Sequence, residues 1–350
     1  MIMTSRERVF AALNHQQPDR VPVDAMLEAT TLKTLMDYFH TDNPQDVFDA
    51  LQVDVQFAYP DSTLPPATLL PDGTWINSDG SRHRRITNDF CTYSHCISRP
   101  LEDAEDVSDL EKYDKWPDAN NYDWAHYSEK IGNLHEKCVI KLPSGGLYEC
   151  AWKLRGQEQF LIDMYENPEI PHYIMEKECN FWCDYVRKAM EVAGDKIDIV
   201  YTFDDIATQA SLIMSPEMLE EFVYPYHRRY NEVIKSYGKK ILFHSCGSVI
   251  SQIDQLRQLP IDILNPLQPQ AAGMDFQHIK DTWGHNLCFH GGIDIQGVLP
   301  NGTPDEVRAA VKNAVNILGK DGGYILCASH NIQNDTPVEN ILAMYDVSIR

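Results

Sequence analysis

Short apolar runs alternate with helix-like segments from about residue 137 onward, and this alternation limits the folds open to the chain. The runs that read as strands cover residues 138–142, 197–202, 240–243, 261–264, 287–289 and 323–326. Strands that alternate with helices form a parallel sheet, because each helix returns the chain to the same edge. The number of units favours a closed (β/α)8 TIM barrel, an α/β fold, over the alternative of an open doubly wound sheet.

Capping patterns mark where several helices begin. They are T-x-x-E at 4–7, S-P-E at 215–217, T-P-D-E at 303–306 and T-P-V-E at 336–339. After the first helix, the two prolines within residues 18–23 predict a break followed by an extended segment. No G-x-G-x-x-G follows the first strand-like run, and the chain has no Walker-type loop, which disfavours a nucleotide-binding fold.

Residues 60–125 differ from the rest of the chain. They are rich in proline, glycine, aspartate and aromatic residues, with turn signals at Asp72-Gly73 and Asp79-Gly80 on either side of Trp75. We expect an irregular, β-rich insertion here. A barrel commonly needs ~250 residues and often carries insertions, so we expect residues 1–350 to form a single barrel domain.

Composition excludes several classes of protein. The formal net charge of −22 argues against nucleic-acid partners and against an anionic membrane surface. No apolar stretch approaches the ~20 residues of a membrane-spanning helix, and the first residues lack the apolar region of a signal peptide. Nine cysteines spread through the chain do not resemble a disulfide framework. We therefore expect a cytoplasmic protein whose cysteines are thiols.

Polar residues follow directly after five of the apolar runs. In a barrel, the carboxyl ends of the strands meet on one face, where active sites lie. We therefore expect an active site formed by side chains from these strand ends. The candidates are Asp204, Asp205, His244, Cys246, Gln268, His290, Asp294, Cys327, His330 and Asn331.

The His244-Ser-Cys246 sequence is the strongest candidate for metal binding. Residues two apart on a strand point to the same side, so the imidazole and the thiol leave the strand end together, as two ligands for zinc. Cys327 or His330 would complete the set. Cys327 continues an apolar run and fits a core position, whereas His330 lies among polar residues. The alternative for the pair itself is a buried histidine beside a thiol that packs as a small apolar group.

The other candidates also have structural alternatives. Asp204 and Asp205 are adjacent on an extended chain, so they cannot both point inward, and one of them is expected to be an N-cap or a solvated end. His290 precedes two glycines, and its alternative role is to hold a backbone carbonyl at that turn.

Several motifs together resemble the uroporphyrinogen decarboxylase superfamily from end to end. They are TSRERVFAAL at 4–13 with PDRVP at 18–22, Asp204-Asp205 before the S-P-E at 215–217, FHSCGS at 243–248, FHGGID at 289–294 and the final T-P-x-E-N at 336–340. The chain is closer to the cobamide-dependent methyltransferases than to the true decarboxylases. The decarboxylases need an arginine-rich loop after the first strand, and residues 24–31 contain no arginine.

The resemblance implies a TIM barrel and a zinc site. In the methyltransferase branch, Zn²⁺ is held by the His-x-Cys pair and by a cysteine seven residues before the proline of the final Thr-Pro motif. That position is His330 in this chain, and Cys327 lies three residues earlier, so His330 fits by register and Cys327 by residue type. An acidic fourth ligand is expected about two dozen residues after the pair, and Gln268 stands near that place.

The resemblance also implies a function. The chain would be the methyltransferase component of a corrinoid-dependent system, moving a methyl group between a corrinoid protein and a small-molecule methyl donor or acceptor, with an O-methyl compound as one option. Asp204 or Asp205, His290 and Asp294 would orient substrate or move protons, with Gln268 and Asn331 as substrate contacts. The alternatives are a cofactor-independent decarboxylase and a non-catalytic barrel that binds a corrinoid or tetrapyrrole. The superfamily's decarboxylases suggest a homodimer.

Overall fold

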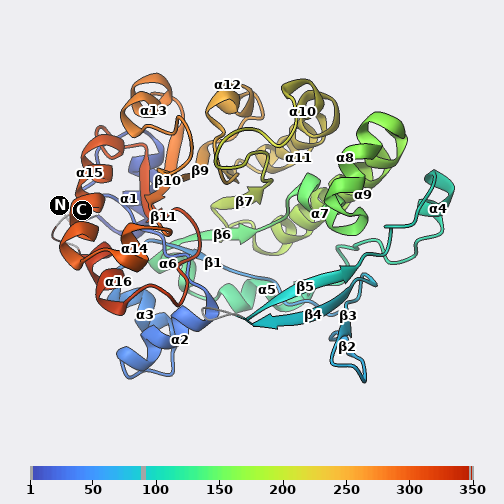
Figure 1. The fold of residues 1–350 in the computed structure, drawn as a ribbon. Coiled ribbons are helices and arrows are strands. Elements are labelled where there is room, and N and C mark those ends of the chain that lie inside the picture. The colour runs from blue at the N-terminus through green and yellow to red at the C-terminus, as the bar shows by residue number, and fades with distance from the viewer. Residues whose placement is uncertain (1–2, 88–91, 347, 349–350) are drawn as a thin grey trace.

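The computed structural model describes residues 3–87, 92–346 and 348. Its centre is a curled, parallel, seven-stranded sheet in which the strands pair in chain order (Figure 1). The strands are β1 (Val55–Phe57), β6 (Val139–Pro143), β7 (Ile199–Phe203), β8 (Lys240–His244), β9 (Ile263–Leu267), β10 (Cys288–Ile293) and β11 (Tyr324–Ala328). Each of the last six strands overlaps one of the six runs predicted as strands.

An extended segment at Val23 and Asp24 occupies the eighth position and closes the sheet. It forms parallel bridges with Leu326 of β11 on one side and Val55 of β1 on the other. The Asp24 amide donates to the carbonyl of Leu326 at 2.9 Å, and the amide of Asp54 donates to the carbonyl of Val23 at 2.8 Å. These bonds join the first and last strands, so the expected (β/α)8 barrel is confirmed.

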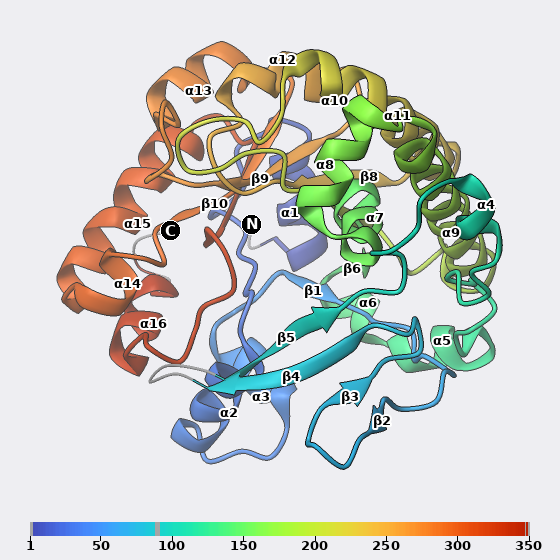
Figure 2. The ribbon, with the colours of Figure 1, turned by 45° about the vertical axis from the view of Figure 1, so that its right-hand side comes forward.

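Helices surround the strands in a ring (Figure 2). They are α1 (Ser5–Leu13), α2 (Ala29–Tyr38), α3 (Pro44–Ala50), α6 (Leu134–Lys137), α7 (Leu147–Arg155), α8 (Gln157–Glu166), α9 (Glu169–Ala193), α10 (Pro216–Phe222), α11 (Tyr224–Ser236), η1 (Ile250–Gln252), α12 (Ile253–Arg257), α13 (Phe276–Trp283), α14 (Val298–Asn301), α15 (Pro304–Leu318) and α16 (Val338–Met344). Val9 and Leu13 of α1 pack on inward-facing strand residues such as Val139 and Leu242. Helix α1 therefore fills one end of the barrel, where these apolar side chains meet. No helix in the described ranges is both long and apolar enough to cross a bilayer.

Three of the four capping predictions are confirmed. Thr4 and Thr303 form capping boxes, and the Ser215 hydroxyl accepts from the amide of Met218. The fourth is wrong: α16 begins at Val338 with Pro337 as its N-cap and no side-chain cap, while the Thr336 hydroxyl donates to Asp335 instead. The turn at Asp335 competes for the hydroxyl, which sequence spacing does not reveal.

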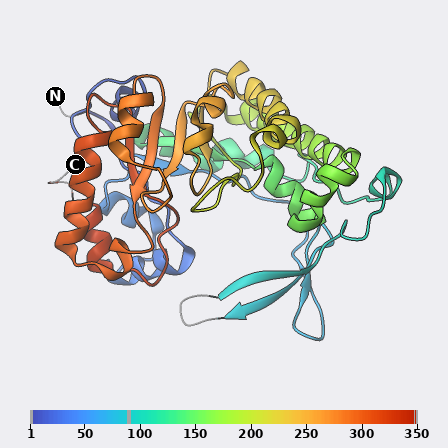
Figure 3. The same ribbon diagram turned by 45° about the horizontal axis from the view of Figure 1, so that its top comes forward.

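The predicted β-rich insertion is present as a separate antiparallel sheet. Its strands, in order, are β2 (Thr68–Leu69), β3 (Trp75–Ile76), β4 (Arg82–Thr87) and β5 (Thr92–Ser98), followed by helices α4 (Val107–Glu111) and α5 (Trp124–Ile131). The ribbon of β4 and β5 projects away from the barrel (Figure 3), and most of its described side chains are exposed.

Candidate active site

Three side chains converge where β8 and β11 end. His244 is the last residue of β8, Cys246 follows two residues later, and His330 lies two residues beyond the end of β11. One nitrogen of each imidazole and the thiol sulfur all lie within 4.8 Å of one another. The His244 Nε2 atom is 3.4 Å from the Cys246 Sγ atom. These three residues form a compact set of two nitrogen donors and one sulfur donor, the kind of set that zinc prefers.

Cys327 does not take part in this set. Its side chain is fully buried inside the barrel, where it lies with Asp24 and His290. Burial raises the pKa of the Cys327 thiol far above its usual value. Of the two residues proposed as the third ligand, His330 is therefore the one that the fold brings to His244 and Cys246.

The electrostatic surroundings of the pair favour a bound cation. Burial lowers the pKa of His244 to about 4, so its ring is neutral near pH 7 and retains a lone pair. Burial, together with the nearby carboxylates of Asp205 and Glu149, raises the pKa of the Cys246 thiol to about 12. A thiolate beside two carboxylates needs a compensating positive charge, and a divalent metal supplies one. The three side chains thus fit zinc in both donor type and charge.

The adjacent aspartates point in different directions, as expected. The carboxylate of Asp204 is buried and accepts from the backbone amides of Leu147, Tyr148 and Glu149 at 2.7–2.9 Å, which caps the start of α7. It also lies 2.6 Å from the His227 Nε2 atom.

Asp205 instead faces the three-residue set. Its Oδ1 atom accepts from the Cys246 amide at 2.8 Å and lies 3.7 Å from the His244 Nε2 atom. Its side chain is 44% exposed, so a substrate entering the barrel mouth can reach it.

Asp294 and Gln268 hold the loops around the site. The Asp294 carboxylate accepts from the Gln296 amide at 2.9 Å and from the Gln270 side-chain amide at 3.0 Å, which fixes the loop after β10. The Gln268 Oε1 atom accepts from the Gly247 amide at 2.8 Å. Gly247 has a φ of +88°, and a Cβ atom there would lie 2.4 Å from a backbone oxygen, so this turn beside Cys246 requires glycine.

Asn331 is the remaining candidate substrate contact. Its side-chain amide donates to Glu28 at 3.2 Å, and it lines a cavity of about 280 Å³ together with Phe57 and Tyr59 at the end of β1. Phe57 packs edge-on against Tyr201, whose ring lies 5.9 Å from that of His244. Asn331 therefore lies beside an aromatic wall that extends toward the three-residue set.

His290 lies beneath the site rather than at its surface. Its side chain is fully buried, with the Nδ1 atom 2.6 Å from the Asn265 Nδ2 atom and the Nε2 atom 2.8 Å from Asp24. The Asn265 Oδ1 atom in turn lies 2.5 Å from the His244 Nδ1 atom. Asp24 also forms a buried ion pair with Lys141. His290, through Asn265, thus connects His244 to the buried ion pair of Asp24 and Lys141.

Sequence reasoning gave no role to Asn265, Asp24 or Lys141. A signal was nevertheless present, because Lys141 interrupts the apolar run of 138–142 and Asn265 ends another run. Lysine is rarely fully buried without a partner, so a charged residue within a barrel strand predicts a buried counter-ion. The identity of that counter-ion required the fold.

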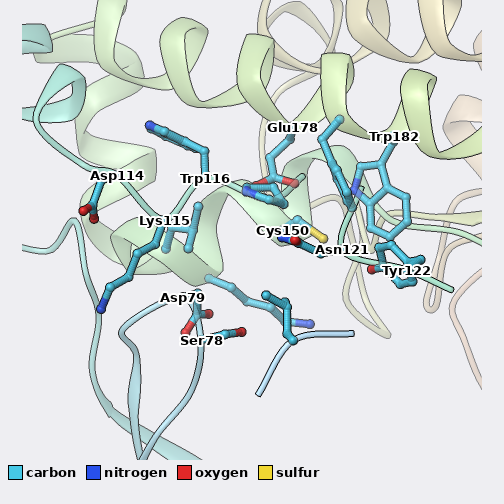
Figure 4. Close-up of a pocket in the computed structure, with 15 residues that line it drawn as sticks. Ser78, Asp79, Asp114, Lys115, Trp116, Asn121, Tyr122, Cys150, Glu178 and Trp182 are labelled. Carbon is cyan, nitrogen blue, oxygen red and sulfur yellow. The ribbon is translucent and has the colours of Figure 1, made fainter. Parts of the chain in front are cut away.

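A separate cavity of about 430 Å³ lies between α9 and the insertion. Glu178 and Trp182 of α9 face Cys150, Asp79 and Lys115 across it (Figure 4). Burial raises the pKa of Glu178 to about 8. None of the three converging residues lines this cavity, so it is distinct from the candidate active site.

A TIM barrel that gathers metal-type donors at the ends of its strands is the architecture of an enzyme with its site at the barrel mouth. The family model described as Uroporphyrinogen decarboxylase (URO-D) matches residues 96–349, and the chain belongs to this family.

Known relatives place the chain near methyltransferases within that family. Methylcobamide:CoM methyltransferase MtbA of Methanosarcina mazei is 22% identical over 98% of this chain and 97% of its own length. Methylated-thiol--coenzyme M methyltransferase of the same organism is 24% identical over 56% of this chain and 49% of its own length. A solved structure of a methyltransferase from Methanosarcina mazei superposes with a TM-score of 0.71 at 17% identity, covering 98% of this chain and 97% of that chain. This structural likeness supports the same fold.

Proposed function

We propose that the chain is a methyltransferase that moves a methyl group between a corrinoid protein and a small substrate, with Zn²⁺ held by His244, Cys246 and His330. The observation that carries the proposal is the convergence of these three donors at the barrel mouth. The similarity to methylcobamide and methylated-thiol methyltransferases supports the type of reaction.

The residues around the three donors have separate tasks in this proposal. Zinc bound there would supply Lewis acidity to a substrate group entering from the mouth. Asp205 is placed to take the proton of an entering thiol or hydroxyl at its Oδ1 atom, because it is exposed and adjacent to Cys246. Gln268 holds the turn that carries Cys246, and Asn331 and the aromatic wall beside it would contact the substrate body.

The surroundings of Cys246 bear on the substrate. The charged groups that act on its thiol are the carboxylates of Asp205 and Glu149. Such a site repels carboxylate groups, and the loop at 24–31 has no arginine to hold them. A decarboxylase of a polycarboxylate is therefore the weaker candidate. A small thiol is the acceptor that the relatives' names favour, and an O-methyl compound remains an option for the donor.

Methyl transfer from methylcobalamin to 2-mercaptoethanol tests the proposal, with the loss of the methylcobalamin absorption band as the readout. Changing His244 or Cys246 to alanine should lower the rate at least about 100-fold, because a Lewis acid contributes several kcal/mol to such a step. The matched control is Cys96→Ser in the projecting ribbon, which should retain the wild-type rate. Transfer that proceeds equally well in all three variants would contradict the proposal.

A further inference from the structure

Five polar side chains form a continuous chain through the barrel interior, and all are buried. Lys141 lies on β6, Asp24 on the closing segment, His290 on β10, Asn265 on β9 and His244 on β8. Their exposed fractions are 0%, 1%, 0%, 1% and 6%. Burying this many polar groups is unfavourable unless each is hydrogen-bonded, so these five side chains must form hydrogen bonds with one another.

The chemistry of the Asn265 amide determines which atom donates in each hydrogen bond of this series. An amide oxygen can only accept, so the hydrogen between Asn265 Oδ1 and His244 Nδ1, 2.5 Å apart, belongs to His244. The amide nitrogen can only donate, so His290 Nδ1, 2.6 Å away, is the acceptor. A neutral His290 then carries its hydrogen on Nε2, which donates to Asp24 at 2.8 Å. Each contact in this series then pairs one donor with one acceptor.

This assignment of donors determines which nitrogen of His244 is free. With the hydrogen fixed on Nδ1, the lone pair of His244 lies on Nε2, the atom that faces Cys246 Sγ at 3.4 Å. The opposite amide orientation would bring the donor nitrogen of Asn265 to His244 and would favour the hydrogen on Nε2, which prevents metal binding there.

Lys141 keeps the carboxyl group of Asp24 ionised at the far end of this hydrogen-bonded series. Burial alone would raise the pKa of Asp24, but the neighbouring Lys141 ammonium and His290 more than offset it and lower the pKa to about 2. Asp24 therefore remains a carboxylate that accepts from His290.

We propose that Asn265, His290, Asp24 and Lys141 are positioning residues that hold His244 in the one tautomer able to bind a metal through Nε2. The inference rests on the zinc site of the proposed function and extends it to residues that touch neither metal nor substrate. Outer partners of this kind commonly change metal affinity about 10–100-fold.

The test compares Asn265→Leu with Asn340→Leu. Both asparagines are 1% exposed, and each makes two described hydrogen bonds through its side chain, but those of Asn340 go to the carbonyls of Leu299 in α14 and of Gly302, directly after that helix. The Zn²⁺ dissociation constant is measured by competition with a chromophoric chelator, and the ligand geometry by the absorption bands of the Co²⁺-loaded protein. We expect Asn265→Leu to weaken zinc binding about 10–100-fold and to shift the Co²⁺ bands, while Asn340→Leu matches the wild type in both.

A second variant covers a failure of Asn265→Leu to fold. His290→Leu leaves Asn265 in place but frees its amide to rotate, and it should also weaken zinc binding and alter the Co²⁺ spectrum. Wild-type affinity in a folded Asn265→Leu or His290→Leu protein, or an equal loss in Asn340→Leu, would overturn the inference while leaving the zinc site intact. Absence of zinc binding in the wild type would instead refute the proposed function itself.

Discussion

Cys327 lies within β11 and His330 lies two residues after its end. The two side chains differ in burial, and this difference gives them different roles. Cys327 is a strand residue whose side chain points into the barrel, whereas His330 lies beyond the strand end and is only partly buried. A cysteine sulfur is a softer donor than a histidine nitrogen and is preferred by zinc. Cys327 is nevertheless fully buried away from His244 and Cys246, and burial strongly raises the pKa of its thiol. Position therefore favours two nitrogens and one sulfur as the ligands of the proposed zinc site.

The Cys246 thiol should be unreactive in the metal-free protein at neutral pH. Because its pKa is raised to about 12, the thiolate fraction is small at pH 8 and increases about tenfold for each pH unit until that value is reached. Asp205→Asn removes one of the carboxylates that raise the pKa, so alkylation should become faster. Iodoacetamide labelling followed by peptide mass spectrometry measures the rate. Rapid labelling of the wild type at pH 7 would contradict the assigned environment.

Part of the site could be predicted from the sequence because it depends on local geometry. His244 and Cys246 are two residues apart, so their side chains point to the same side. Asp204 and Asp205 are adjacent, so their side chains point to opposite sides. The contacts of Asn265 with His244 and His290 could not be predicted in this way. They depend on the register between β8, β9 and β10, in which His244 pairs with Asn265 and a register shift precedes Gly291.

Among the secondary-structure elements, the six apolar runs correctly predicted six strands of the barrel. The strands end up to four residues later than the corresponding runs. The three-residue strand β1 was not predicted, because so short a segment has no measurable periodicity. Residues 18–23 were correctly expected to begin an extended segment, but its place beside both β1 and β11 depends on barrel closure. The capping motifs at Thr4 and Thr303 succeeded because the hydrogen bonds in a capping box are local.

The two adjacent aspartates should differ in what they stabilise. Asp204→Ala removes an acceptor from three amides at the start of α7 and leaves His227 without its partner, so the free energy of unfolding should fall by about 2 kcal/mol or more. Asp205→Ala should change it by less than about 1 kcal/mol, because this side chain is 44% exposed and accepts from the amide of Cys246 rather than from three amides. Urea denaturation of both variants measures the difference. Equal losses would show that Asp204 does not cap the start of α7.

At the scale of the whole molecule, the candidate zinc site joins segments far apart in the chain. His244 and Cys246 lie at and just after the end of β8, while His330 follows β11, the last strand in the chain. A metal held by all three would cross-link the ends of β8 and β11, two strands that are not neighbours in the sheet. The single-domain organisation and a homodimer remain predictions at this scale.

Zinc should therefore stabilise the folded protein. A ligand that binds only the folded state adds about 2.7 kcal/mol at a free concentration 100 times its Kd. The melting temperature should rise when Zn²⁺ is added to the chelator-treated protein, and His330→Ala should remove most of the increase. Differential scanning fluorimetry measures the shift, with Mg²⁺ as the control ion because it prefers oxygen ligands. A similar rise in His330→Ala would indicate that zinc binds elsewhere.

X-ray absorption at the zinc edge of the loaded protein identifies the residues that hold the metal, because it counts the ligands by type. We expect one zinc per chain with one sulfur at about 2.3 Å and two histidine nitrogens at about 2.0 Å, from Cys246, His244 and His330. The sulfur signal should disappear in Cys246→Ala and persist in Cys327→Ala. Two sulfur ligands, with loss of one in Cys327→Ala, or a protein that retains no zinc at all, would contradict this set of ligands.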